Sequence, residues 1–95
     1  MKIYTQAAVD NFCEKYPDSI VDVIPGVLVD SIIFWLGDDR WVLIKEQYIN
    51  PWSSGYTFHN FNSEEKCYLK LGYESREHMI ETGISEGWLS AEEYA

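Results

Sequence analysis

The side chains most able to bind a metal ion or act as a general base are two histidines, His59 and His78, and two cysteines, Cys13 and Cys67. The histidines lie far apart in the sequence, and neither has a cysteine or a second histidine at the spacing of a metal-binding motif. The segment 53–55, Ser-Ser-Gly, lacks the Gly-x-Ser-x-Gly pattern of a serine nucleophile. We therefore expect a protein that is not an enzyme and that has no metal site and no cofactor.

Paired carboxylates, which many hydrolases use, have local explanations in this chain. Asp38 and Asp39 lie in a predicted turn, where aspartate is common. The glutamate pairs at 64–65 and 92–93 fall in predicted first turns of helices, where negative charge interacts favourably with the helix dipole. Catalytic carboxylates need a cleft that raises one pKa, and no such cleft is indicated.

The glutamates of the C-terminal region are not explained by local stability. Glu74, Glu77 and Glu81 follow one another at spacings of three and four, so in a helix they share a face, where like charges repel by about 0.2–0.5 kcal/mol per pair. Residues 74–95 contain six glutamates and one arginine, a net charge of −5, against −9 for the whole chain. This distribution indicates either a solvated face that keeps the protein soluble, or a surface that imitates nucleic-acid phosphates.

The elements that position these residues are predicted from periodicity. Residues 5–16 have the apolar spacing of an amphipathic helix, and residues 20–24, 31–36, 41–49 and 56–61 read as strands. The segment 27–30 either continues a bent strand or forms a short hairpin around Pro25 and Gly26, and three short helical pieces follow residue 62. We predict a single α+β domain over residues 1–95, with an N-terminal helix, a three- to four-stranded antiparallel sheet and short C-terminal helices.

The hairpin at residues 31–49 is the centre of the predicted sheet. If Leu36 pairs with Trp41 across the Gly-Asp-Asp-Arg loop, Trp35 and Trp41 lie on opposite faces, and both faces are apolar. Such a hairpin should be covered on both sides, either by its own chain or by a partner. If the few predicted helices do not cover both faces, one face remains as an apolar patch for a partner or a second copy of the chain. Trp35 and Trp41 are candidate contact residues, because tryptophan is prominent in interface energetics.

Composition excludes several classes of function. The 16 acidic and 7 basic residues argue against direct binding of nucleic acid or an anionic membrane, since both need basic patches. No apolar run approaches the roughly 20 residues of a membrane span, and the N-terminal residues lack the apolar stretch of a signal peptide. Two cysteines are too few for a disulfide framework, so we expect a cytoplasmic protein.

The chain resembles small acidic proteins that phages encode against host defence, including anti-CRISPR proteins and DNA mimics. The resemblance rests on short length, acidic charge, aromatic strands and the ending Glu-Gly-Trp-Leu-Ser-Ala-Glu-Glu-Tyr-Ala at 86–95, which is similar to the closing residues of short phage reading frames. These inhibitors share no motif, so the resemblance implies no residue role. It implies action in the cytosol of the host cell on a protein partner such as a CRISPR effector.

Three functional hypotheses follow from the sequence. The first is a non-enzymatic inhibitor that occupies the basic, nucleic-acid-binding surface of a protein partner. The second is a structural or assembly module, such as a phage morphogenesis component or a homodimer joined through the uncovered sheet face. The third is a small-ligand binder or enzyme that uses His59, Tyr48 and Trp52 around the loop at 50–55. For the first two, the candidate partner-binding residues are Glu74, Glu77, Glu81, Glu86, Asp38, Asp39, Trp35 and Trp41.

Overall fold

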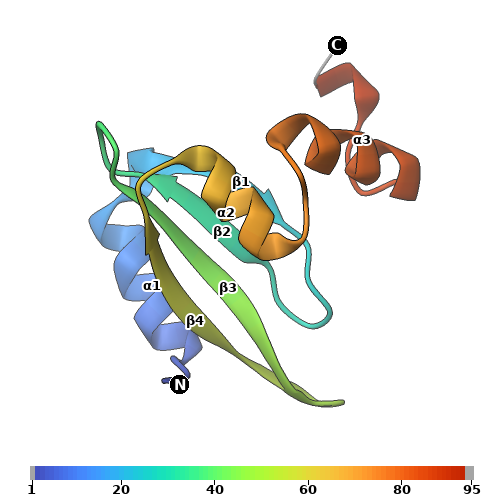
Figure 1. The fold of residues 1–95 in the computed structure, drawn as a ribbon. Coiled ribbons are helices and arrows are strands. Elements are labelled where there is room, and N and C mark those ends of the chain that lie inside the picture. Colours follow the sequence, from blue (N-terminus) through green and yellow to red (C-terminus); the bar gives the residue numbers. More distant parts are fainter. Residues whose placement is uncertain (1, 94–95) are drawn as a thin grey trace.

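The computed structural model describes residues 2–93, and Figure 1 shows their arrangement as a sheet between helices. The predicted α+β class is confirmed: an N-terminal helix precedes four antiparallel strands in the order β1-β2-β3-β4, and two α-helices follow them. The elements are α1 (Gln6–Lys15), η1 (Pro17–Ser19), β1 (Ile20–Ile24), β2 (Ser31–Trp35), β3 (Trp41–Asn50), β4 (Ser53–Phe61), α2 (Glu64–Leu71), α3 (Arg76–Glu86) and η2 (Ala91–Glu93).

The register of the central hairpin differs by one residue from the prediction. Trp35 pairs with Trp41, not Leu36 with Trp41, and the Leu36 N–H donates to the Arg40 carbonyl. The turn is shorter than expected because Gly37 and Asp38 both adopt positive φ, which reverses the chain within three residues. Since side chains alternate between faces, the expectation that Trp35 and Trp41 lie on opposite faces was wrong. They lie on the same face and stack with ring centroids 6.0 Å apart.

Both faces of the sheet are packed against helices. On one face, Val9 of α1 contacts a cluster formed by Phe34, Val42, Ile44 and Tyr56. On the other face, a second cluster joins strand residues to residues of α2 and α3: Ile24, Ile33, Leu43, Cys67, Tyr68 and Met79. Of the two alternatives left open by the sequence, the chain itself covers both faces, because α1 and α2 lie on opposite sides of a sheet only four strands wide (Figure 1).

The segment 25–30 forms a loop between β1 and β2, so a strand at 27–30 is not observed. The backbone N–H groups of Val27, Leu28 and Val29 bond to the Glu46 carboxylate and not to a neighbouring strand, which explains why this apolar run does not form a strand.

Helix α3 continues through Gly83, although a glycine is a natural helix stop. A Cβ atom at Gly83 would lie within 3.0 Å of side-chain atoms of Leu89 and Trp88, so the absent side chain lets the following segment fold back onto α3. Across the described part of the chain, no helix has the length and apolar character needed to cross a membrane.

Candidate partner-binding surface

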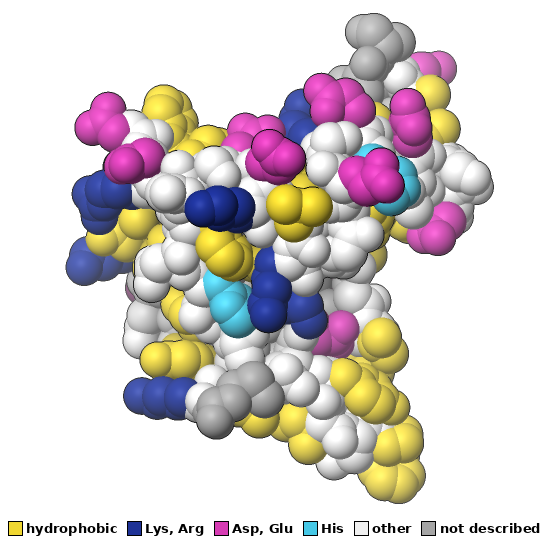
Figure 2. Space-filling model, in the orientation of Figure 1, with side chains coloured by type: hydrophobic (Ala, Val, Ile, Leu, Met, Phe, Trp, Pro, Cys, Tyr) yellow, Lys and Arg dark blue, Asp and Glu magenta, His cyan; other side chains and the backbone are white. Residues whose placement is uncertain are grey.

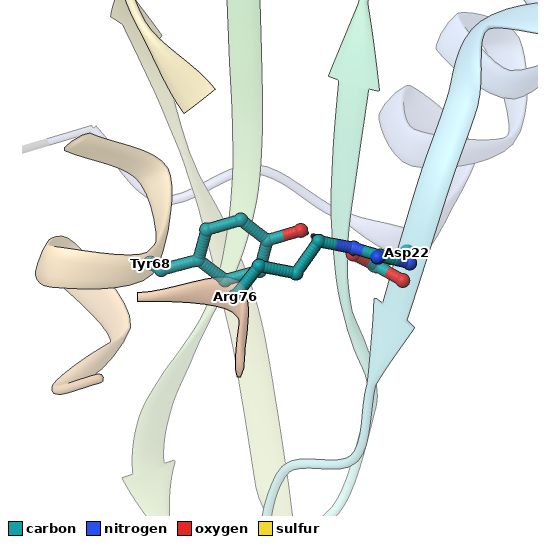
Figure 3. Close-up of polar contacts among 3 residues, drawn as sticks. All are labelled: Asp22, Tyr68 and Arg76. Atoms are coloured by element: carbon teal, nitrogen blue, oxygen red, sulfur yellow. Dashed lines mark hydrogen bonds and ion pairs between the residues drawn. The ribbon is translucent and has the colours of Figure 1, made fainter. Parts of the chain in front are cut away.

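The surface that carries most of the predicted acidic residues is held in place by three side chains from three elements. Asp22 comes from β1, Tyr68 from α2 and Arg76 from α3, and Figure 3 shows them converging beside the sheet. The Tyr68 hydroxyl donates a hydrogen bond to Asp22 Oδ2, and the Arg76 Nε–H donates to the same oxygen over 3.1 Å. This contact joins the edge strand to both C-terminal α-helices.

The buried position of the Asp22 carboxylate explains why it is paired with both Tyr68 and Arg76. The Asp22 side chain is 6% exposed, and an ionised carboxylate at such a site needs a cation and hydrogen-bond donors to offset lost hydration. Burial, together with the hydrogen bond to Asp22, raises the pKa of Tyr68. The hydrogen bond to Asp22 also raises the pKa of Arg76, whose side chain is 38% exposed. The first turn of α3 is thus fixed against β1 and the middle of α2.

The same contact brings together carboxylates that are distant in the sequence. A surface hollow of about 410 Å³ lies where α2 and α3 begin, lined by Glu64, Glu65, Tyr68, Ser75, Arg76 and Glu77. Ser75 caps α3 by accepting a hydrogen bond from the His78 N–H. Figure 2 shows acidic side chains gathered over the first turn of α2 and over α3.

The predicted glutamates occupy different positions relative to α3. Glu77 and Glu81 are exposed and one turn apart on the helix. Glu74 precedes the Ser75 cap, so the expectation that it continues the same helical face was wrong. Glu86 is the last residue of α3 and accepts a hydrogen bond from the Trp88 indole N–H over 3.1 Å. We define the acidic helix face as the three carboxylates beside the hollow and the next one along α3: Glu64, Glu65, Glu77 and Glu81.

The remaining predicted contact residues lie at another corner of the molecule, the turn between β2 and β3. Asp38 and Asp39 are exposed there, and the Trp35 indole N–H donates to the Asp38 carbonyl over 3.0 Å. Trp35 is half-exposed, whereas Trp41 packs partly buried against the core cluster beneath α2. The eight predicted residues therefore form two groups instead of one surface.

Comparison with known proteins identified no relative. No protein-family model, curated protein or solved structure matches this chain. The role of this surface is therefore inferred from the geometry of its residues. That geometry adds two residues that sequence analysis attributed to helix stability alone, Glu64 and Glu65. No local signal marks them as neighbours of Glu77, because their proximity depends on the long-range contact of Asp22 with Arg76.

The histidines and the aromatic residues proposed for a ligand-binding or catalytic site do not lie together in one site. His59 is hydrogen-bonded to Thr57 Oγ1 and stacks on Phe61, while His78 Nδ1 accepts the Glu74 N–H over 3.0 Å. Tyr48 and Trp52 are exposed near the end of the β3–β4 hairpin, so they do not form a closed pocket with His59. Among residues 2–93, no group of three or more metal-binding side chains is positioned to hold an ion.

Proposed function

We propose that the protein is a non-enzymatic interaction protein whose acidic helix face occupies the basic, nucleic-acid-binding surface of a protein partner. The observation that supports this function is the gathering of carboxylates from α2 and α3 around one hollow, fixed by the buried contact of Asp22 with Tyr68 and Arg76. Carboxylates on ordered elements need little reorganisation on binding, so less conformational entropy is lost than for a flexible acidic tail.

Electrostatics favours a basic protein as the partner. Three of the four glutamates of the acidic helix face are exposed, and Glu64 is half-buried. Such a surface attracts cationic grooves at a distance and repels nucleic acids and anionic membranes. In its narrower form, the proposal is a phage-encoded anti-CRISPR protein that acts in the host cytosol on a CRISPR effector. Helices cover both sheet faces, which removes the surface proposed for a homodimer through the sheet, whereas the phage morphogenesis alternative stays a prediction.

Charge reversal on α3 tests the proposal directly. Wild-type protein and the Glu77→Lys/Glu81→Lys variant would serve as bait for capture from host lysate, and each partner protein would be identified by mass spectrometry. We expect the double variant to lose at least tenfold in affinity, since two attractive contacts become repulsive. Excess duplex DNA or structured RNA should also release the captured partner from the bait, because the nucleic acid and the acidic helix face compete for the partner's basic surface.

The matched control is Glu14→Lys/Asp18→Lys, which changes the net charge equally but lies at the end of α1 and in η1. Both control positions are exposed, so the fold should be retained. Equal loss of binding in the two double variants would indicate a general charge effect and contradict a localised surface. Binding that neither reversal nor nucleic acid affects would refute the proposed function.

A further inference from the structure

A second surface is apolar, in contrast to the acidic helix face. At the turn end of the β3–β4 hairpin and in the neighbouring β1–β2 loop, five large apolar side chains are exposed: Val27 (72%), Leu28 (45%), Tyr48 (47%), Ile49 (52%) and Trp52 (87%). Figure 2 shows apolar side chains gathered over this end of the molecule. We call these five residues the hairpin-end patch. They expose on the order of 500 Å², comparable to the largest apolar patches of monomeric proteins.

The two segments of the patch are held together by Glu46 of β3. Its carboxylate accepts hydrogen bonds from the backbone N–H groups of Val27 and Leu28, over 2.7 and 2.8 Å, and from the Ser54 hydroxyl of β4 over 2.8 Å. The N–H of Val29 donates to the same carboxylate over 3.0 Å. The exposed apolar residues of the loop are therefore presented by an ordered backbone, attached to the hairpin that carries Trp52.

Charged side chains are absent from the outer part of the hairpin, beyond Glu46, and are concentrated elsewhere. Residues 47–63, which include all of β4, contain no Asp, Glu, Lys or Arg, although such residues make up 24% of the chain. The acidic helix α3 lies at the opposite end of the molecule from the hairpin tip (Figure 1). Two copies that meet through their hairpin ends would keep their like-charged helices far apart, so self-association there incurs little electrostatic repulsion.

We propose that the hairpin-end patch is a homodimer interface whose occupant is the same patch on a second copy of this chain. A two-fold arrangement places the projecting Trp52 of each copy against the apolar loop residues Val27 and Leu28 of the other. A standard interface buries about 800 Å² on each partner, more than this patch exposes, so the dimer dissociates at micromolar concentration. A bilayer is the less favourable occupant, because the patch has no basic residue and the chain carries a charge of −9.

Sedimentation velocity of the full chain over a wide concentration range tests the dimer. We expect the weight-average mass of the wild type to rise from one towards two chain masses, and Trp52→Ser/Leu28→Ser to raise the dissociation constant at least tenfold. Leu69→Ser is the matched control, because Leu69 is 52% exposed on α2, away from the patch, and its replacement should leave the dimer unchanged. Circular dichroism of each variant checks that the fold is retained.

Three results would overturn the proposal. A chain that stays monomeric at several hundred micromolar has no such interface, and a dimer that survives the double substitution uses another surface. A monomer that co-floats with phosphatidylcholine vesicles through Trp52 would assign the patch to a bilayer. The proposed inhibitory function is tested separately by reversing charges on α3, so either proposal can fail while the other holds.

Discussion

At the scale of single residues, the buried charge of Asp22 fixes how β1, α2 and α3 are placed relative to one another. Removing a carboxylate from water costs several kcal/mol, and its hydrogen bonds to Tyr68 and Arg76 offset much of that cost without guaranteeing a net gain in stability. The main consequence is geometric. Asp22 is separated from these partners by 46 and 54 residues, so the contact forms only when β1, α2 and α3 are correctly assembled.

The first prediction at this scale concerns the free energy of unfolding. Asp22→Ala should lower it by about 2–4 kcal/mol, because the Tyr68 hydroxyl and the Arg76 guanidinium each lose a hydrogen bond to the Asp22 carboxylate. Tyr68→Phe should cost only about 1 kcal/mol, since Asp22 keeps its bond to Arg76. Urea unfolding followed by circular dichroism measures both. The control Asp18→Ala removes an exposed carboxylate and should change stability by less than about 0.5 kcal/mol. Equal effects at positions 18 and 22 would contradict the role of the network.

At the scale of elements, the unequal lengths of the strands leave the end of the β3–β4 hairpin exposed. Strands β3 and β4 have 10 and 9 residues, whereas β1 and β2 have 5 each, so the β3–β4 hairpin extends beyond the rest of the sheet. Glu46 lies on β3 just beyond the part that pairs with β2, and its carboxylate replaces the missing strand as hydrogen-bond acceptor for the β1–β2 loop. Burial acts to raise the pKa of Glu46, but the hydrogen bonds from Leu28, Val27, Ser54 and Val29 outweigh it and lower the pKa.

The second prediction follows from this lowered pKa. The ionised Glu46 carboxylate stabilises the fold above its ordinary pKa of about 4.5, and this contribution is lost as the pH falls through the lowered native pKa. Glu46→Gln should therefore accelerate amide hydrogen exchange of Val27, Leu28 and Val29 at neutral pH, because a neutral amide group accepts less well from three N–H donors. The control Glu65→Gln alters an exposed glutamate of α2 and should leave these amides unchanged. Unaltered exchange in Glu46→Gln would show that the loop is ordered by other contacts.

At the scale of the whole molecule, charge and apolar surface are segregated. Carboxylates cluster around α2 and α3, while the hairpin end carries exposed tryptophan, tyrosine and aliphatic residues (Figure 2). The two proposed interactions consequently depend on different forces. Partner binding relies on long-range attraction that salt screens, and dimerisation relies on burial of apolar surface, which salt does not weaken.

The third prediction is that salt affects the two interactions in opposite directions. Raising NaCl from 0.1 to 1 M shortens the screening length from about 10 to about 3 Å, so the association rate with the captured partner should fall at least tenfold. The homodimer should persist or tighten, since repulsion between two chains of charge −9 is screened. Stopped-flow association and sedimentation velocity at the two salt concentrations measure these effects. A partner association rate that is independent of salt would contradict electrostatic recognition.

The sequence by itself determined the α+β class, the order of the elements and the acidic character of the C-terminal region. These properties depend on local periodicity and composition, as in the amphipathic helix before Pro17 and the aromatic strands around Gly37. The sequence also led to Glu77 and Glu81 as exposed acidic residues of one helix, because spacings of four are read directly along the chain.

Only the tertiary structure decided the hairpin register, the covering of both sheet faces and the surroundings of the glutamates. Positive φ at Gly37 and Asp38 shifted the pairing by one residue and placed Trp35 beside Trp41, a choice that the Gly-Asp-Asp-Arg letters leave open. The grouping of Glu64 and Glu65 with Glu77 depends on a contact between β1 and α3, which are distant in sequence. Such contacts depend on how whole elements pack, and local patterns show which face of an element is apolar but not which element that face meets.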